Sequence, residues 1–398
     1  MKLLVVIPYY WPALMHGGPV VSLHGLNKAM AEKGVDVTVY TTDVDLQGEV
    51  PVNRETLVDG VKVTYFSFSP ALEFITPFGW QFSPRLGRAL KEDLNRFDLV
   101  YINTVWRYPA AIAAYYCRRY LKPYIIAPRG MLYPELFSKK LWKKWPYYKL
   151  FVEKSLKFSW AIHYTSEDEA LRTEEFLRLN KRRLIVPNGI DVPDFQQPAD
   201  RDSLNKRYPQ LKNKKIILFL GRLNWKKGLD ILVKAFAKLA RERGDARLLI
   251  AGPDELRYKE KIKDWIRQSG LAYNGQVTFT GMLKGEEKLE VYRNSEIFIL
   301  PSYSENFGVT VVEALASGLA VIISNKVGIC EEVLKNKAGM VIDTQAESAY
   351  KALKLLLDDP ALRKELGING RKLAEENYSV GKIADKMIGS FREALETR

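Results

Sequence analysis

The most informative segment of the chain is Pro301-Ser302-Tyr303-Ser304-Glu305-Asn306-Phe307-Gly308-Val309-Thr310-Val311-Val312-Glu313-Ala314-Leu315-Ala316-Ser317-Gly318. The apolar run 297–300 before it predicts a buried strand, and 309–316 predicts a short helix with a glycine at each end. A turn at a strand's C-terminal end then leads into a helix N-terminus. In an open α/β sheet this is where ligands bind, and the free backbone N–H groups there suit phosphate.

Two carboxylates frame this turn. Glu313 lies one to two turns into the predicted helix, and its side chain leans back towards the N-terminus. A carboxylate there can accept hydrogen bonds from two adjacent hydroxyls, such as those of a ribose. The alternatives are that Glu313 faces water and that Glu305 only complements the helix dipole.

The composition indicates a globular α/β protein with a basic excess. A length of 398 residues predicts two domains, and 47% hydrophobic with 27% charged residues is typical of soluble proteins. Cys117 and Cys330 form no metal or redox spacing, so we expect a reduced, cytosolic setting. The three histidines form no predicted zinc cluster.

No membrane-spanning helix is expected, because no run of about eighteen apolar residues occurs. The apolar start, Leu3 to Ile7, is too short for a signal peptide and lacks a small-residue cleavage site, so we interpret it as the first strand.

Strand-like and helix-like runs alternate along the whole chain, which predicts parallel sheets with crossover helices. Residues 42–60 and 67–83 are expected to be rich in loops and to line a cleft, and 146–158 to be a helix. The segment Pro187-Asn188-Gly189-Ile190-Asp191-Val192-Pro193 and the polar sequence after it mark a domain boundary. We therefore predict a domain over 1–190 and a second over 191–378, with a cleft between facing strand ends.

In each half of the chain, a glycine-containing loop follows the first predicted strand. Gly17-Gly18-Pro19 opens the first helix, at the usual phosphate-approach turn of a doubly wound domain, although any tight turn could use two glycines. Gly221-Arg222-Leu223-Asn224-Trp225-Lys226-Lys227-Gly228 offers an arginine fork and a lysine point charge for a diphosphate; the alternative is a solvated basic loop. No Asp-x-Asp pair is placed to hold Mg²⁺, since Asp43 and Asp45 are interpreted as surface residues. We therefore expect no metal or other cofactor, with protein cations neutralising the diphosphate.

These motifs together resemble glycosyltransferase family 4, the group 1 glycosyl transferases. The resemblance rests on Gly221-Arg222 with Lys227-Gly228, on the spacing of Glu305 and Glu313 in Ser-x-x-Glu-x-Phe-Gly, and on the boundary segment that begins at Pro187. It covers essentially the whole chain. It implies the GT-B fold of two Rossmann-like, doubly wound α/β domains, a retaining and metal-independent reaction, and a last helix (379–398) that crosses back to the first domain.

The resemblance also implies roles for individual residues. Arg222 and Lys227 match the residues that bind the donor diphosphate, Glu313 matches the ribose ligand, and Glu305 matches the carboxylate at the reaction centre; Glu305, Arg222 and Lys227 are thus the candidate catalytic residues. Further donor contacts are implied at Gly18, at Met282 and Leu283 beside the base, and at the backbone of Phe307, Gly308 and Val309.

One position departs from the family pattern. Asn103 stands where the family often has a histidine near the donor sugar, and asparagine cannot carry charge. This puts the donor sugar in question more than the activity. The run Pro128-Arg129-Gly130-Met131-Leu132 resembles a subgroup that builds surface polysaccharides. Arg129 and Trp106 are the candidate acceptor-side residues, and a structural salt bridge is the alternative for Arg129.

Positive charge is concentrated in residues 118–157, which contain eleven Lys and Arg against two Glu. The run Lys139-Lys140-Leu141-Trp142-Lys143-Lys144-Trp145-Pro146-Tyr147-Tyr148-Lys149-Leu150-Phe151 mixes lysines with aromatic residues. Such a mixture favours an anionic membrane surface, and the alternative is a helix with its aromatic side in the core. We predict a cytoplasmic enzyme, peripheral on the inner face of the cell membrane.

The predicted reaction is transfer of a hexose from a nucleotide diphosphate sugar to a hydroxyl of a glycan or lipid-linked acceptor, with retention. The alternatives are a nucleotide-sugar epimerase of the same fold, which would need acid–base residues that Asn103 does not supply, and a non-catalytic nucleotide-sugar-binding protein. A nucleic-acid binder would explain the charge, but no recognition motif for nucleic acid is present.

Overall fold

The chain divides into two compact α/β units. The structure is a computed structural model that describes residues 1–13, 15, 18–46, 48–75, 79–138, 141–255 and 257–397. One unit contains Met1–Gly189 together with Val380–Arg398, and the other contains Ile190–Ser379. The two units are described separately below.

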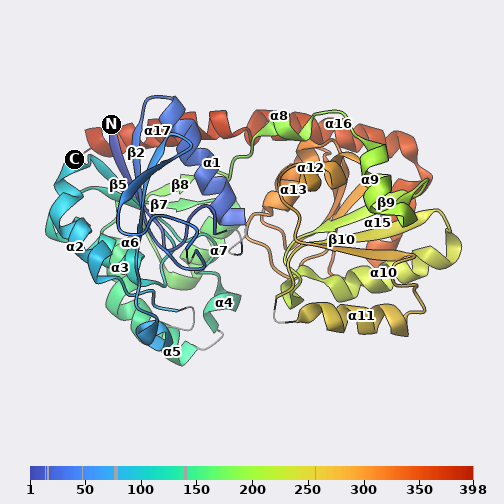
Figure 1. The fold of residues 1–398 in the computed structure, drawn as a ribbon, viewed down its shortest axis with the longest axis horizontal. Helices are drawn as coiled ribbons and strands as arrows, with labels where there is room; N and C mark the ends of the chain where they lie inside the picture. Colours follow the sequence, from blue (N-terminus) through green and yellow to red (C-terminus); the bar gives the residue numbers. More distant parts are fainter. Residues whose placement is uncertain are drawn as a thin grey trace. The chain divides into compact units, whose positions relative to one another are not determined.

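The N-terminal unit is built on an eight-stranded sheet in the order β3-β4-β2-β1-β5-β6-β7-β8 (Figure 1). All pairs are parallel except β3 with β4. The strands are β1 Lys2–Val6, β2 Asp36–Thr42, β3 Glu55–Val58, β4 Val61–Phe66, β5 Leu99–Asn103, β6 Tyr124–Ala127, β7 Ala161–Tyr164 and β8 Arg183–Ile185. The strand order reverses between β1 and β5, which is where such sheets bind ligands.

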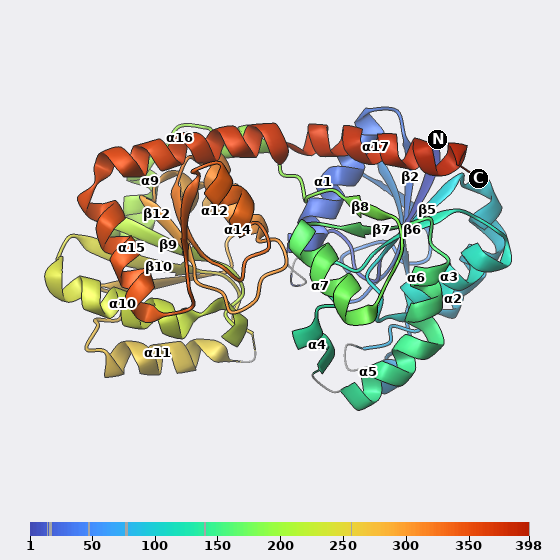
Figure 2. The same cartoon turned by 180° about the vertical axis from the view of Figure 1, so that it is seen from behind.

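Helices cover both faces of this sheet. Alternate residues of β1 join different clusters: Leu3 and Val5 pack with α1 and α17, whereas Leu4 and Val6 pack with α2 and α3. Figure 2 shows α17 running beside α1. The helices are α1 Gly18–Glu32, α2 Pro84–Asp93, α3 Tyr108–Arg119, α4 Pro134–Ser138, α5 Leu141–Tyr147, α6 Glu153–Lys157, α7 Glu167–Leu177 and α17 Val380–Glu396.

The structure refines two expectations for this unit. Segment 42–60, expected to be rich in loops, also contains strand β3, which forms a hairpin with β4 through Asp59-Gly60, both with positive φ (48° and 80°). Asp-Gly is a strong hairpin signal, and it was overlooked. The predicted helix 146–158 is interrupted by a π-helical turn, Tyr148–Val152, that follows Pro146. Pro146 removes only the hydrogen bond from residue 146 back to residue 142, which lies before the π-helical turn.

The C-terminal unit is a six-stranded, all-parallel sheet in the order β11-β10-β9-β12-β13-β14. Its strands are β9 Lys215–Leu220, β10 Ala246–Ala251, β11 Val277–Gly281, β12 Ile297–Leu300, β13 Ala320–Ser324 and β14 Gly339–Ile342. Its helices are α8 Val192–Phe195, α9 Arg201–Arg207, α10 Leu229–Glu242, α11 Tyr258–Gln268, α12 Gly285–Arg293, α13 Val309–Ala316, α14 Cys330–Lys335, α15 Ala346–Asp358 and α16 Pro360–Asn377.

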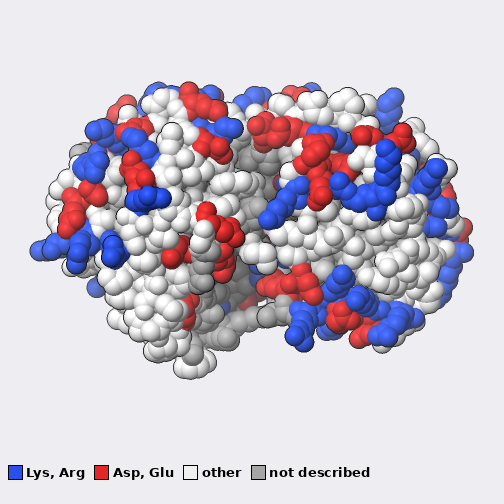
Figure 3. Space-filling view, in the orientation of Figure 1, with Lys and Arg blue, Asp and Glu red and all other residues white. Residues whose placement is uncertain are grey.

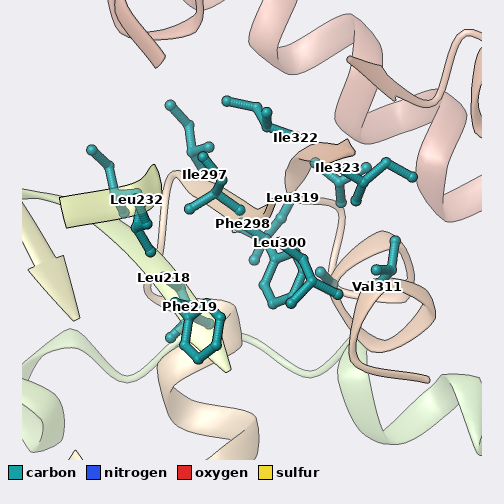
Figure 4. Packing of buried hydrophobic residues seen from close by; sticks show 14 of the residues in the cluster. Leu218, Phe219, Leu232, Ile297, Phe298, Leu300, Val311, Leu319, Ile322 and Ile323 are labelled. Carbon is teal, nitrogen blue, oxygen red and sulfur yellow. The ribbon is translucent and has the colours of Figure 1, made fainter. Parts of the chain in front are cut away.

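The strands of this sheet are buried on both faces, as their continuous apolar sequences predict. Phe298 and Leu300 of β12 are fully buried among residues of β9, β13 and α13, and Figure 4 shows this packing with Phe219 and Val311. The predicted strand 297–300 and helix 309–316 are both confirmed to the residue. The rigid core thus fixes the loops after β9 and β12, on either side of the point where the strand order reverses.

Candidate active site

The turn between β12 and α13 has the predicted form. Gly308 adopts a left-handed conformation (φ +86°) immediately before the helix begins at Val309. A Cβ atom at Gly308 would lie 3.1–3.2 Å from side-chain carbons of Val311 and Val327, so space and conformation both favour glycine. The first N–H groups of α13 have no partners within the helix, which leaves them available to an anion.

The loop after β9 packs directly against this turn. The backbone N–H of Tyr303 donates to the carbonyl of Lys226 (2.7 Å). Gly228 has φ +65°, and a Cβ atom there would collide with the carbonyl group of Pro301. Asn224 stabilises the loop by accepting the N–H of Lys226 through its side chain (3.1 Å). The predicted diphosphate loop and the predicted helix N-terminus therefore form one structure.

Lys227 and Glu305, from these two loops, form an ion pair. Their side chains are 14% and 21% exposed, so both groups are partly withdrawn from water. A carboxylate and an ammonium group in such a position hold each other in place more firmly than an exposed pair would. The sequence predicted a role for each residue but not their contact.

Arg222 lies further out than Lys227. Its guanidinium is 3.6 Å from the carboxylate of Glu255, and its side chain is 47% exposed. Glu255 also accepts a hydrogen bond from the side chain of Asn224 (2.7 Å). The sequence analysis missed Glu255, because a single glutamate after β10 carries no distinguishing signal.

Glu313 does not face water, so that alternative is wrong. The residue is 5% exposed, and its two carboxylate oxygens have separate partners. Lys288 Nζ donates to Oε1 (2.7 Å) and Tyr292 Oη donates to Oε2 (2.9 Å). Both partners lie on α12 and were not singled out in the sequence, although their i, i+4 spacing places them on one helix face.

The loops after β10 and β11 complete this edge of the sheet. Gly252 donates its N–H to the carbonyl of Gly281 (2.8 Å), and a Cβ atom at Gly252 (φ +137°) would collide with the backbone of Gly221. Met282 and Leu283, predicted to lie beside a base, directly follow and are partly exposed. Loops carrying the predicted diphosphate and base contacts are thus in backbone contact with one another.

Phe307 has a different role from its neighbours. Its side chain is 2% exposed and packs edge-to-face on Tyr378, with ring centroids 5.7 Å apart. The ring therefore anchors the turn, and only the backbone of Phe307 is placed to contact a ligand.

In the N-terminal unit, Asn103 and Arg129 belong to a buried polar network at the ends of β5 and β6. Asn103 is fully buried and accepts from Arg129 Nε (3.1 Å) and Nη2 (2.8 Å). Arg129 also donates to Asn188 Oδ1 (2.7 Å) and Tyr101 Oη (2.9 Å). The alternative of a structural salt bridge is not what the contacts show, because these partners are neutral.

His163 extends this network into the core. Its Nε2 lies 2.8 Å from the carbonyl of Val186, which can only accept, so Nε2 carries the proton and Nδ1 accepts from Tyr101 Oη (2.6 Å). Burial, with Arg129 adding to it, lowers the pKa of His163 to about 3. The imidazole is therefore neutral at physiological pH.

The remaining predicted residues of this unit are Trp106 and Gly18. Trp106 is 1% exposed, donates its indole N–H to the carbonyl of Met131 (3.0 Å) and packs on Phe137 and Tyr147. A contact with an acceptor would require these neighbours to move. Gly18 is the first residue of α1, and Gly17 lies outside the described residues.

Within the described part of the chain, no group of three or more His, Cys, Asp or Glu side chains is arranged to hold a metal ion. Likewise, none of the described helices is long and apolar enough to cross a membrane.

Comparison with known proteins agrees with this geometry. The sequence model described as "Glycosyl transferases group 1" matches residues 200–373, and "Glycosyltransferase Family 4" matches residues 16–193. Together they account for most of the chain. The chain therefore belongs to the family 4, group 1 glycosyltransferases.

Individual relatives are distant but extend over long stretches. An uncharacterized glycosyltransferase of Methanocaldococcus jannaschii is 24% identical over 100% of this chain and 99% of its own. The capsular polysaccharide biosynthesis glycosyltransferase CapM of Staphylococcus aureus is 24% identical over 72% of this chain and 73% of its own.

Solved structures establish the fold. The sucrose-phosphate synthase of Thermosynechococcus elongatus covers 100% of both chains with a TM-score of 0.77 and 19% identity. Anabaena HepE in complex with UDP-glucose covers 99% of this chain and 100% of its own, with a TM-score of 0.76 and 17% identity. The predicted GT-B fold is confirmed.

Proposed function

We propose that this glycosyltransferase moves a hexose, with retention, from a nucleoside diphosphate sugar to a hydroxyl of a glycan or lipid-linked acceptor in surface-polysaccharide assembly. The observation that carries the proposal is the joining of two loops at the switch point of the C-terminal sheet. There, Lys227 and Glu305 meet beside the N-terminus of α13. Cations and helix amides at one point suit a diphosphate, and a carboxylate beside them suits the sugar it carries.

In the proposed reaction the leaving diphosphate is stabilised by the protein. Lys227 and Arg222 supply positive charge, and the N–H groups at Gly308 and Val309 supply oriented dipoles. No metal is then needed to neutralise the leaving group. The catalytic share of the protein is positioning and charge stabilisation.

The acceptor proton goes to the leaving phosphate in this proposal. Glu305 is engaged by Lys227, so we do not assign it as the general base. The bond from C1 of the sugar to the phosphate oxygen breaks, the acceptor oxygen bonds to C1 on the same face, and its proton moves to that phosphate oxygen. Retention of configuration follows from this geometry.

The donor and the acceptor are proposed as classes of compound. HepE holds UDP-glucose, so UDP-hexoses are the first donors to test, and CapM acts in capsular polysaccharide biosynthesis. Asn103 and Arg129, held together in the N-terminal unit, are proposed as the sugar-side and acceptor-side residues. Gly18, Met282 and Leu283 are proposed as donor contacts.

The test is a product analysis. Purified protein is given each UDP-, GDP- and ADP-hexose with a panel of glycan and lipid-linked acceptors, and products are assigned by NMR. We expect release of nucleoside diphosphate. We also expect the new glycosidic bond to have the same anomeric configuration as the bond between C1 and the phosphate in the donor. An inverted product would overturn the retaining assignment.

The same experiment separates the alternatives. An epimerase would convert the donor without an acceptor, and a binding protein would shift in melting temperature with nucleotide sugar but release no diphosphate. Either outcome would replace the transferase proposal.

Peripheral attachment to an anionic membrane is a further part of the proposal. Trp142 and Trp145 of α5 are 75% and 45% exposed, as shallow insertion requires. The expectation that the lysines of this run face an anionic membrane is wrong for Lys144, whose residue is only 4% exposed. Lys149 is exposed but forms an ion pair with Glu153 (2.5 Å). Lys139 and Lys140 lie outside the described residues, as does the side chain of Lys143.

A groove beside this segment carries positive charge that could attract an anionic membrane, which the buried Lys144 cannot do. It has a volume of about 610 Å³ and runs along α3, with Trp80, Tyr108, Ala111, Ile112, Tyr115, Leu150 and Phe151 as apolar lining and Arg118, Arg119 and Lys154 as basic lining. In the part of the chain that the structure describes, none of these three cations pairs with a carboxylate. On the face shown in Figure 3, several Lys and Arg side chains lie over α2 and α3, and the surface over α11 carries side chains of both charges.

A further inference from the structure

Helix α12 holds the carboxylate of Glu313 from one side. Lys288 and Tyr292 lie four residues apart and reach different oxygens of the same group, at 2.7 Å and 2.9 Å. The Glu313 side chain is 6% exposed and that of Lys288 is 22% exposed, whereas Tyr292 is fully buried. Tyr292 therefore holds the inner side of the carboxylate, and Lys288 lies nearer its solvent-facing side.

The carboxylate retains capacity for two more hydrogen bonds. An ionised carboxylate offers about four lone-pair sites, two on each oxygen. Tyr292 occupies one site on Oε2 and Lys288 occupies one on Oε1, which leaves one on each oxygen. Two acceptor sites on neighbouring oxygens match two adjacent hydroxyl groups.

We propose that Lys288 and Tyr292 are positioning residues that orient Glu313 so that its two free acceptor sites bind the vicinal hydroxyls of the donor ribose. This inference rests on the proposed function, in which Glu313 is the ribose ligand. It assigns to α12 the selection of ribonucleotides over deoxyribonucleotides.

The two residues are themselves held in place. Phe195 of α8 packs edge-to-face on Tyr292, with centroids 5.9 Å apart, and Lys288 Nζ lies 5.6 Å from the centre of the Phe195 ring. Burial, with the charge of Glu313 adding to it, raises the pKa of Tyr292 well above its usual value of 10. The hydroxyl therefore remains a donor to Glu313.

The same constellation occurs a second time in this unit, away from the proposed site. Tyr350 and Lys354 of α15, again four residues apart, donate to Glu242 of α10 at 2.6 Å and 3.0 Å. Here the glutamate and lysine side chains are 40% and 44% exposed. This exposed triad provides matched control substitutions.

The test compares nucleotide pairs that differ in one hydroxyl. Binding of UDP, GDP and ADP and of their 2′-deoxy forms is measured by calorimetry for wild type, Glu313→Gln, Tyr292→Phe and Lys288→Gln. We expect wild type to prefer the ribonucleotide about tenfold, and each α12 variant to reduce that preference about threefold to fivefold. Affinity for the deoxynucleotide, which keeps the 3′-hydroxyl, should fall by a smaller factor than affinity for the ribonucleotide.

The control variants are Tyr350→Phe and Lys354→Gln, which should leave both affinities unchanged. Melting temperatures establish that each variant is folded, and Lys288→Gln keeps the test informative if Tyr292→Phe does not fold. Equal weakening of both nucleotides by the α12 variants would indicate a merely structural role and would overturn the proposal.

The outcome for Glu313→Gln separates this inference from the proposed function. If that variant loses the ribonucleotide preference while both α12 variants keep it, only the positioning roles are wrong. If Glu313→Gln keeps the preference, or wild type shows none, then Glu313 does not bind ribose and the site assignment falls as well.

Discussion

Gly228 and Pro301 are in backbone contact: a Cβ atom on Gly228 would collide with the carbonyl group of Pro301. The glycine also has a left-handed conformation, φ +65°. Two loops that are more than seventy residues apart in sequence can therefore touch only because one of them has no side chain here.

Gly228→Ala should consequently separate the two loops. We expect the free energy of unfolding to fall by about 1–3 kcal/mol, from strain and overpacking. The free energy of nucleotide binding should fall by more than this. Thermal unfolding and calorimetry measure the two effects. Gly244→Ala is the control, because a Cβ atom there has no neighbour within 4 Å; equal effects of both substitutions would contradict the close-contact argument.

Lys227→Ala should reduce kcat/KM more than Arg222→Ala does. Lys227 is partly buried and pairs with Glu305, whereas Arg222 is 47% exposed. A charge-assisted hydrogen bond contributes on the order of 1.5–3 kcal/mol, or roughly tenfold to a hundredfold in rate, and solvent screening reduces the share of the exposed residue. Steady-state kinetics with varied donor test this order.

Lys226→Ala is the matched control for these variants, since it removes the same charge from the same loop. Its backbone carbonyl, which binds Tyr303, is retained. A loss equal to that of Lys227→Ala would show that the loop acts through general charge rather than through one placed ammonium group.

Turnover should not require a divalent metal. The proposed cations and helix amides neutralise the leaving diphosphate without one. Activity is measured after exhaustive EDTA treatment and dialysis, and we expect it to be unchanged within about twofold. Loss of activity that Mg²⁺ or Mn²⁺ restores would refute this part of the mechanism.

Stability should fall as pH drops below about 6.5 because of His163. Its folded-state pKa is lowered to about 3, whereas the unfolded value is near 6.5. The unfolded chain then binds the extra proton first. The free energy of unfolding loses up to about 1.4 kcal/mol per pH unit from this residue between pH 6.5 and 3, and none above that window.

His163→Gln tests this assignment, because glutamine can still donate to Val186 but cannot be protonated in this range. Urea unfolding at pH 7 and pH 5 should show a smaller difference for the variant than for wild type. His24, whose pKa burial also lowers, remains in both proteins and cancels. An unchanged pH difference would contradict the prediction.

Binding to anionic vesicles should depend on the groove cations and on the exposed tryptophans. We expect co-sedimentation with anionic but not neutral vesicles, and release by salt, because 0.15 M salt screens charges beyond about 8 Å. Trp142→Ser with Trp145→Ser should weaken it through lost insertion. The charge variant changes Arg118, Arg119 and Lys154 to Gln.

The control for charge changes Lys351, Lys364 and Lys372 of the C-terminal unit to Gln, an equal loss of charge. We expect it to pellet like wild type, since each lysine near the surface contributes about 1 kcal/mol only where it faces the membrane. Equal pelleting of all variants, or none, would remove the membrane proposal and leave the transferase proposal in place.

Local sequence predicted the β12–α13 turn well because each signal there has a short-range cause. The apolar strand, the glycine at the helix start and the helix itself are all read within about twenty residues. The hydrogen-bond partners of Glu313 could not be predicted from the sequence around it. Lys288 and Tyr292 reach it only because α12 and α13 pack together, and nothing local to either helix records that contact.

Asn103 and Arg129 show the same limit in the N-terminal unit. Each was identified by its place after a strand, yet their mutual hydrogen bonds depend on β5 and β6 being neighbours. The left-handed conformations of Thr104 (φ +73°) and Arg129 (φ +56°), just after these strands, have no sequence signature in non-glycine residues.

The return of α17 to the N-terminal unit makes the C-terminal unit an insertion within its host. The ends of the inserted segment are joined to each other, since Ile190 donates its N–H to the carbonyl of Tyr378 (2.9 Å) and bridges Ser379. A segment whose ends meet can be transplanted without leaving loose chain. Residues 190–379 are thus a contiguous inserted domain that could be moved into another protein as one segment. The N-terminal unit, in contrast, needs the sequence on both sides of the insertion, residues 1–189 and 380–398.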